Sequence, residues 1–283
     1  MELGMILGEI QRPTLEELLQ AVRGYGFTQI QFGYASVCGT DMPEALEPEF
    51  VQSIRTQALA SGIEIVAVSG TWNMIHPDTA VREQGLARLD VIAESCQHLG
   101  CDFVTLCTGT RNRESMWRWH ADNQTQSAWD DLLVTMQRAL EIAERHDVYL
   151  GIECEASNVV NTPERARQLM DTFGSPRLKI IMDVANLFQR GEAREENVRP
   201  IMDNAFALLG NDIQIAHGKD IKAGEELEFT HAGNGIIDFG YYVEKLRACG
   251  YTGGMVLHGI KEERYMSEAV AHMREVLAAH ESL

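Results

Sequence analysis

The sequence lacks the features that define several classes of protein. Its six cysteines contain no CxxC pair, and in a chain of 283 residues they predict reduced thiols in a cytoplasmic protein instead of a disulfide framework. No stretch approaches the ~18 consecutive apolar residues that a transmembrane helix requires. The amino terminus, MELGMILGEIQRP, has no basic leader and no signal-peptide pattern.

Positive charge is also scarce. The 24 lysines and arginines stand against 42 aspartates and glutamates, which gives a formal net charge of −18. Because affinity for nucleic acids and for anionic membranes comes largely from lysine and arginine, this balance argues against both partners. Hydrophobic residues make up 45% of the chain, which is enough for a sizeable core and too much for a disordered chain.

Short apolar runs alternate with longer amphipathic runs from end to end. The short runs are mostly apolar at successive positions, which is typical of strands buried on both faces of a parallel sheet. They predict strands in eight segments, 3–7, 28–33, 64–70, 103–109, 149–154, 178–184, 212–218 and 253–259.

The amphipathic runs between these segments predict helices. Thr14 and Glu17 form a capping-box pattern before one helix, and Thr162 followed by Pro163 marks the start of another. The helices are expected in segments 14–26, 80–100, 127–147, 163–174, 239–250 and 267–280.

Repeated strand–helix units predict an α/β fold, a closed (β/α)8 TIM barrel that forms a single domain over residues 1–283. An open doubly wound sheet would also alternate strands and helices, but it more often carries a glycine-rich phosphate loop after an early strand. The segment 3–13, LGMILGEIQRP, is not such a loop, and no Pro-, Gly- or Ser-rich linker divides the chain.

Polar residues close four consecutive predicted strands. Glu153, Asp183, His217 and His258 stand at the ends of strands five to eight. Because the chemistry of such a barrel lies where its strands end, these side chains are expected to converge. A lone carboxylate at a strand end is often only a cap, but four ligand-type residues in register favour one divalent metal ion. Two carboxylates and two imidazoles suit Mn, Co, Fe or Zn, and Mg less well.

Residues beside these four are candidates for substrate binding and proton transfer. Glu155 points the same way as Glu153 if the strand stays regular, and otherwise forms a salt bridge or a cap. Asn186 contacts a substrate hydroxyl or forms a turn. Lys219 stabilises charge on a substrate oxygen, or forms a buried ion pair with Asp220 that supports the loop.

The earlier strands offer candidates for the walls of a substrate pocket. Trp72 and His76 line the pocket, or else lie in the core and cap a helix. Arg111 directly follows a strand and grips an anionic or hydroxyl group of the substrate. The surrounding segment 111–120, rich in arginine and tryptophan, forms a lid or a contact in a homo-oligomer. His231, in a glycine-rich segment, enters the pocket.

Several of these segments resemble a known family. The chain is similar to the sugar phosphate isomerase/epimerase group of the xylose isomerase-like TIM-barrel superfamily, which also contains the endonuclease IV type of DNA-repair enzyme. The resemblance covers nearly the whole chain. It is most specific in segments 69–78, 106–120, 151–171, 183–188, 217–220 and 232–239.

The resemblance implies a ligand set. Such relatives bind one divalent metal through Glu, Asp, His and Glu, which correspond here to Glu153, Asp183 and His217, with His258 standing where the last Glu would be. In ketose 3-epimerase-like relatives the two metal-bound glutamates also transfer the proton. The resemblance therefore implies a catalytic role for Glu153, whereas His258 departs from the symmetric two-glutamate pattern. The larger metal cluster of the endonuclease relatives has no matching residue set here.

The expected function is that of a divalent-metal-dependent isomerase or epimerase of a sugar, sugar phosphate or polyol. The reaction would abstract a proton next to a metal-polarised carbonyl, with Glu153, His258 and Lys219 as catalytic residues. An inosose-type dehydratase begins with the same step and is the first alternative. A non-catalytic barrel that binds a sugar-like ligand is the second, because His258 departs from the family pattern.

Overall fold

The apolar runs of the sequence form a closed barrel in the computed structural model, which describes residues 1–280. Its eight parallel strands follow one another around the barrel, β6 pairs with β7, and β9 lies between β7 and β1. The predicted TIM barrel is confirmed. The strands are β1 (Leu3–Ile6), β2 (Gln29–Phe32), β3 (Glu64–Ser69), β4 (Phe103–Leu106), β5 (Tyr149–Glu153), β6 (Leu178–Asp183), β7 (Ile213–Ile221) and β9 (Met255–Leu257).

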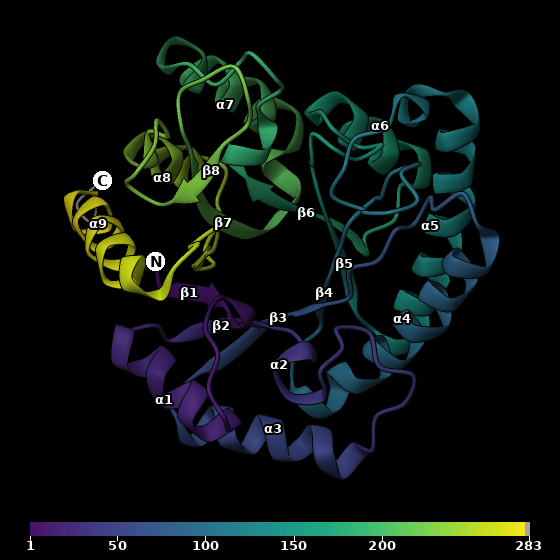
Figure 1. Ribbon diagram of the computed structural model, residues 1–283, viewed down its shortest axis with the longest axis horizontal. Helices are drawn as coiled ribbons and strands as arrows, with labels where there is room; N and C mark the ends of the chain where they lie inside the picture. Colours follow the sequence, from purple (N-terminus) through teal and green to yellow (C-terminus); the bar gives the residue numbers. More distant parts are fainter. Residues whose placement is uncertain (281–283) are drawn as a thin grey trace.

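Helices surround the strands on the outside of the barrel (Figure 1). They are α1 (Leu15–Tyr25), α2 (Ala35–Cys38), α3 (Pro48–Ala60), α4 (Thr79–Leu99), α5 (Gln126–His146), α6 (Pro163–Phe173), α7 (Glu195–Leu209), α8 (Phe239–Ala248) and α9 (Met266–Ala279). The sequence patterns assign no helix to α2, α3 or α7. None of these three begins with a side-chain cap, and α7 contains Pro200, so the usual start and continuation signals are weak.

Two predicted helix starts have the expected geometry. Thr14 Oγ1 accepts a hydrogen bond from the Glu17 backbone N–H at 3.2 Å, and Thr162 Oγ1 accepts one from the Arg165 N–H at 3.3 Å. Each hydroxyl pairs a backbone donor that the first turn of a helix cannot pair itself. Within residues 1–280, no helix is long and apolar enough to cross a membrane.

The seventh barrel strand is longer than the sequence predicts. β7 continues to Ile221 and pairs in antiparallel fashion with β8 (Phe229–His231), with Lys219 opposite His231. The hairpin extends past the end of the barrel. It therefore places the residues of β8 beside the ends of β7 and β9, where the predicted functional residues lie.

Trp72 lies against helix α4. Its side chain is buried, and a Cβ atom added at Gly85 in α4 would overlap the indole ring. Gly85 therefore provides the space in which the indole packs between the barrel and the helix. This position agrees with the alternative in which Trp72 lies in the core.

We expect Gly85→Ala to lower the free energy of unfolding by about 1–3 kcal/mol, because the added methyl group overpacks the Trp72 site. Gly24→Ala is the matched control, since a Cβ at this position in α1 meets nothing within 4 Å. The control should leave stability unchanged or raise it by up to about 1 kcal/mol through helix propensity. Chemical denaturation of both variants measures the difference, and equal stabilities would contradict this packing.

Candidate metal centre

The four predicted ligands converge at the end of the barrel where the strands terminate. Glu153 ends β5, Asp183 ends β6, His217 lies directly opposite Asp183 in the pairing of β6 with β7, and His258 follows β9. One oxygen or nitrogen atom from each side chain lies within 4.8 Å of the others. The parallel registers of neighbouring strands therefore bring together residues that are up to 105 positions apart in sequence.

One ring nitrogen of His217, Nδ1, has no hydrogen-bond partner within residues 1–280. Its Nε2 lies 3.0 Å from Oε1 of Gln31, an oxygen that can only accept, so Nε2 carries the hydrogen. The lone pair on Nδ1 then lies 3.7 Å from Oε2 of Glu153, and the buried Nδ1 has no hydrogen-bond partner among residues 1–280. Two acceptors that face each other cannot bond directly. A cation between them would satisfy both, which is the arrangement expected of a metal ligand pair.

Gln31 contacts the candidate site and was missed by the sequence analysis. Its side-chain amide donates to Oγ of Ser69 at 3.2 Å and lies 3.5 Å from Oγ1 of Thr105, so its oxygen is turned toward His217. These polar residues come from β2, β3 and β4 and cover the inside of the barrel beneath the cluster. The available signal was a glutamine between two apolar residues, Ile30 and Phe32, within a predicted strand.

Asp183 is the most strongly stabilised anion of the cluster. It is fully buried, and its Oδ2 lies 2.8 Å from Nε2 of His258 and 3.1 Å from Nζ of Lys219. Burial alone would raise the pKa of this carboxyl group, but Lys219 and His258 outweigh burial and hold its pKa well below the usual range. Burial and the neighbouring Lys219 lower the pKa of His258, which favours a neutral imidazole that can donate a lone pair.

Glu155 adds a third carboxylate to the same site. Burial, followed by repulsion from Glu153, raises the pKa of Glu155 to about 8. With all groups ionised, the carboxylates of Glu153, Glu155 and Asp183 face the single ammonium of Lys219, which leaves two negative charges uncompensated. A buried excess of this size is costly, and a divalent cation would neutralise it.

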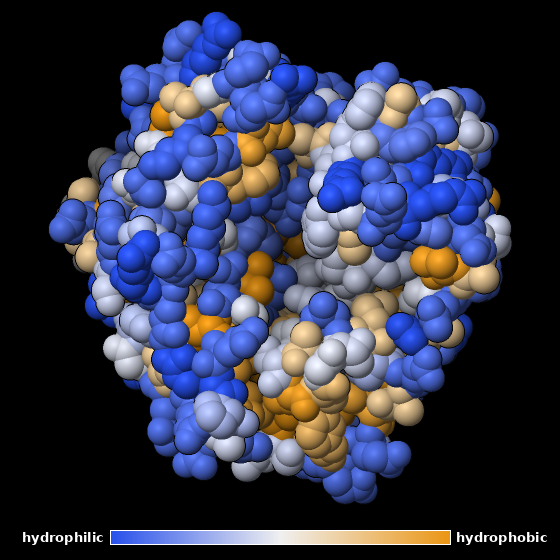
Figure 2. Space-filling model, in the orientation of Figure 1, coloured by the Kyte–Doolittle hydropathy of each residue, from blue (hydrophilic) through white to orange (hydrophobic). Residues whose placement is uncertain are grey.

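The cluster lies beside a cavity of about 570 Å³. Glu153, Glu155, His217, Lys219 and His258 contribute to its polar lining. Apolar side chains also line the cavity, namely Ile6, Leu106, Trp117, Leu227 and Phe229, and the centroid of the Phe229 ring lies 4.2 Å from Nζ of Lys219. In the orientation of Figure 1, the space-filling view shows a hollow near the centre of the molecule, with hydrophilic side chains over much of the surrounding surface (Figure 2).

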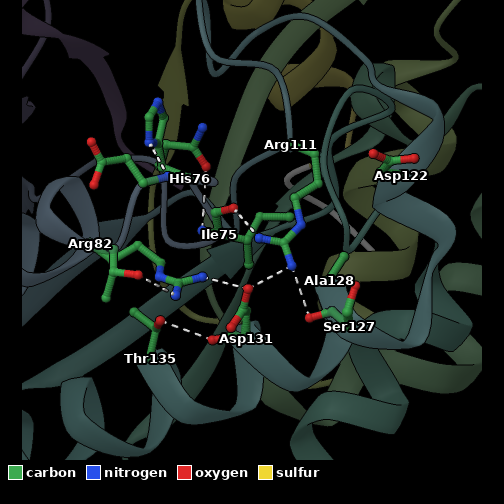
Figure 3. Close-up of polar contacts among 12 residues, drawn as sticks. Ile75, His76, Arg82, Arg111, Asp122, Ser127, Ala128, Asp131 and Thr135 are labelled. Carbon is green, nitrogen blue, oxygen red and sulfur yellow. Dashed lines mark hydrogen bonds and ion pairs between the residues drawn. The ribbon is translucent and has the colours of Figure 1, made fainter.

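Asn186 and Arg111, two of the predicted substrate-binding residues, make other contacts. Asn186 is buried and donates from Nδ2 to Oε1 of Glu153 at 2.6 Å, while its Oδ1 accepts from Lys219. It therefore links two residues of the cluster. Arg111 lies outside the cavity lining, where its guanidinium donates to the backbone oxygens of Ile75 and Ser127 and pairs with Asp131 (Figure 3).

The other three predicted pocket residues also lie outside the cavity lining. Trp72 packs on α4, as described above, and Nδ1 of His76 accepts a hydrogen bond from the Asp78 N–H at 3.1 Å, beside the start of α4. His231 is buried and stacks on Tyr265, with ring centroids 4.9 Å apart. The contacts with Asp78 and Tyr265 hold both rings outside this cavity.

The segment after β4 does reach the cavity, through Trp117. This residue lines the cavity although its side chain is 56% exposed. The two backbone oxygens that flank it are both held, since Met116 O accepts from Asn158 and Arg118 O accepts from Thr110 at 2.9 Å. Side-chain hydrogen bonds therefore fix the edge of the cavity on which Trp117 stands.

Asp220 organises the backbone of the loop after β8. Its carboxylate accepts hydrogen bonds from the backbone N–H groups of Gly233, Gly235 and Ile237 at 2.9–3.1 Å, and from that of Ile221 at 2.8 Å. Within residues 1–280, Asp220 forms no hydrogen bond or ion pair with Lys219 or with an imidazole. The glycine-rich segment is thus wrapped around a buried anion.

Known proteins share parts of this sequence. The chain is 26% identical over 176 residues to L-ribulose-5-phosphate 3-epimerase UlaE of Escherichia coli O1:K1 / APEC, a match that covers 62% of this chain and 56% of that protein. It is 24% identical over 241 residues to the inosose dehydratase of Geobacillus kaustophilus, which covers 78% of this chain and 73% of that protein. The chain therefore spans little more than half the length of the first of these relatives.

Solved structures share the fold over the whole chain. The IOLI protein, whose crystal structure contains a binding zinc atom, superimposes with a TM-score of 0.70 at 16% identity, over 99% of this chain and 97% of that one. At this identity the likeness shows the fold alone. The family model of the xylose isomerase-like TIM barrel matches residues 19–276, and the chain belongs to this family.

Proposed function

We propose that the protein is a divalent-metal-dependent sugar isomerase or epimerase that moves a proton next to a carbonyl group. The observation that carries this proposal is Nδ1 of His217, which has no hydrogen-bond partner within residues 1–280 and faces the Glu153 carboxylate beside a cavity large enough for a small substrate. The names of the relatives, a sugar phosphate epimerase and an inosose dehydratase, support this class of chemistry.

Glu153, Asp183, His217 and His258 would hold the ion. Two carboxylates and two imidazoles favour a borderline divalent metal such as Mn, Co, Fe or Zn, with Mg less suited. When bound, such an ion supplies Lewis-acid polarisation of a substrate carbonyl and so acidifies the neighbouring C–H group.

Glu153 is the proposed base. Its Oε1 accepts the Asn186 amide at 2.6 Å, which fixes the direction of the carboxylate as it faces the cavity. A base held in one orientation loses little entropy when it takes a proton from a bound substrate. His258 or Glu155, both of which also line the cavity, would return the proton.

Lys219 is proposed to stabilise negative charge that develops on the substrate oxygen. It is buried, lines the cavity, and is held by Asp183 and Asn186. Burial lowers the pKa of Lys219, but Asp183, Glu155 and Glu153 outweigh burial and raise its pKa overall, so the amine stays protonated. A fixed ammonium in a partly dehydrated site stabilises charge more than one in water does.

Removal of one carboxylate should abolish metal binding. We expect Asp183→Asn to lose the single equivalent of transition metal that the wild-type protein retains after Mn²⁺ loading and dialysis, measured by elemental analysis. Asp131→Asn is the matched control, because Asp131 pairs with Arg82 and Arg111 outside the cavity. Full metal content in the Asp183→Asn variant would contradict the assignment of Asp183 as a metal ligand.

Gln31 should control metal affinity without touching the ion. Gln31→Met removes the acceptor that fixes the His217 tautomer, and loss of such a partner typically weakens metal binding by about 10–100-fold. Gln31→Glu keeps an acceptor and should bind metal more tightly than the methionine variant. Competition with a chromogenic chelator measures both, and equal affinities in the wild-type and methionine proteins would argue against this role.

Deuterated water distinguishes the two reactions that begin with the same proton abstraction. An isomerase or epimerase should release product of unchanged composition with one deuterium on carbon, whereas a dehydratase should release product lighter by one water. Mass spectrometry of the products formed from a panel of ketoses, ketose phosphates and inososes measures both outcomes as a change in product mass. Glu153→Gln should lose the exchange, because an amide cannot accept the proton. Turnover by the wild type without any incorporation of solvent deuterium would contradict the proton-transfer mechanism.

A further inference from the structure

Two groups of backbone N–H donors at the mouth of the barrel are already occupied by carboxylates. In (β/α)8 enzymes, a phosphate group frequently binds to backbone N–H groups in the loops after strands seven and eight. Here, in the connection after the seventh barrel strand, the N–H groups of Gly233, Gly235 and Ile237 all donate to Asp220. The donors that could receive a phosphate are therefore paired with an internal anion.

The loop after the eighth barrel strand has the same arrangement. The N–H groups of Gly259 and Ile260, which follow His258, donate to the two oxygens of Glu9 at 3.0 Å and 2.9 Å. Glu9 ends the short 3-10 helix that follows β1, and it is half-buried. A phosphate at either position would meet a resident carboxylate, and two anions at such a distance repel each other.

The side chains also leave no cation for a phosphate. Lys219 is the one lysine or arginine among the described residues that line the cavity, and it is bound to Asp183 and Asn186. Several cations of the surrounding loops pair with carboxylates, Arg118 with Glu114 of its own loop, and Arg190 with Glu226 and Lys261 with Glu228 of a different loop. The cavity itself already holds the carboxylates of Glu153 and Glu155.

The lining instead fits neutral polyhydroxyl compounds. Hydroxyl groups of Thr71, Thr105 and Ser157 line the cavity and can both donate and accept. Leu227, Phe229 and Trp117 add apolar surface to the same cavity, on which the C–H face of a sugar can pack without loss of a polar contact. A dianionic phosphate against this wall would lose its hydration without gaining a donor.

We propose that the cavity takes an unphosphorylated, neutral ketose or cyclic polyol ketone and discriminates against its phosphate ester, with Leu227 on the wall that excludes the phosphate. This inference rests on the proposed function, because it names the substrate class of the same site. It also separates this chain from the relative whose name specifies a sugar phosphate, L-ribulose-5-phosphate 3-epimerase.

Binding of matched pairs to the Mn²⁺-loaded protein tests the inference. Calorimetric titration with L-ribulose and L-ribulose 5-phosphate, and with D-fructose and D-fructose 6-phosphate, should show that the ester binds at least ~10-fold more weakly than its parent ketose in a pair that binds. An ester that binds as tightly as its ketose, or a failure of every ketose to bind, overturns the proposal.

A substitution in the wall should reverse the preference. Leu227→Arg introduces a guanidinium beside the cavity and should raise the affinity for the ester, relative to the affinity for its parent ketose, by at least ~10-fold. Leu227→Gln is the matched control and should give no gain for the ester. Equal behaviour of the arginine and glutamine variants would overturn the assignment of Leu227.

The deuterium-exchange experiment keeps this test separate from the proposed function. A ketose that binds selectively but exchanges no proton would contradict the proposed reaction and leave the selectivity intact. A phosphate ester that binds preferentially and exchanges its proton would support the reaction and overturn the selectivity.

Discussion

The burial of like charges at the mouth of the barrel is the constraint on which the rest of the site depends. Glu153, Glu155 and Asp183 share a small volume with one ammonium, that of Lys219. Such an excess is tolerated in a protein only where hydrogen bonds, cations or protonation compensate it. Asn186 between Glu153 and Lys219, the His258 contact to Asp183 and the raised pKa of Glu155 are all responses of this kind. A single divalent cation would neutralise the same excess of negative charge.

Internal polar side chains hold the loops around this cluster. Asp220 and Glu9 collect backbone N–H groups of the loops after the last two barrel strands, while Asn158 and Thr110 hold the carbonyls on either side of Trp117. Buried hydrogen bonds to charged or amide groups are directional, so they define loop positions that apolar contacts would leave free. The cavity is consequently shaped before any ligand enters it, and the selectivity that we propose would follow from groups that have no catalytic role.

The sequence predicts the parts of the site that depend on strand order. Uninterrupted apolar runs mark the eight strands, and the residue at the end of each strand must face the mouth of the barrel, so the four converging side chains follow directly. The positions of side chains in loops are harder to predict from the sequence. Arg111 and His231 have suitable chemistry close to strand ends, yet Asp131 and Tyr265, distant in sequence, determine where their side chains lie. Gln31 was missed for the opposite reason, because its partner His217 is 186 residues away and a lone glutamine in a strand carries no motif.

His258 makes the two sides of the cluster chemically unequal. A glutamate at this position, as the resemblance would have it, would bring a fourth carboxylate to a site that already holds three against Lys219. A neutral imidazole avoids this additional charge. Nε2 of His258 lies 2.8 Å from Oδ2 of Asp183, so the ring stays within the cluster. Glu155 also lines the cavity and, under the proposed function, would act as a further proton carrier. In the proposed reaction, proton removal and return would then be shared between Glu153 and Glu155 of the β5 end and His258 of the β9 end, and a symmetric pair of metal-bound glutamates is not required.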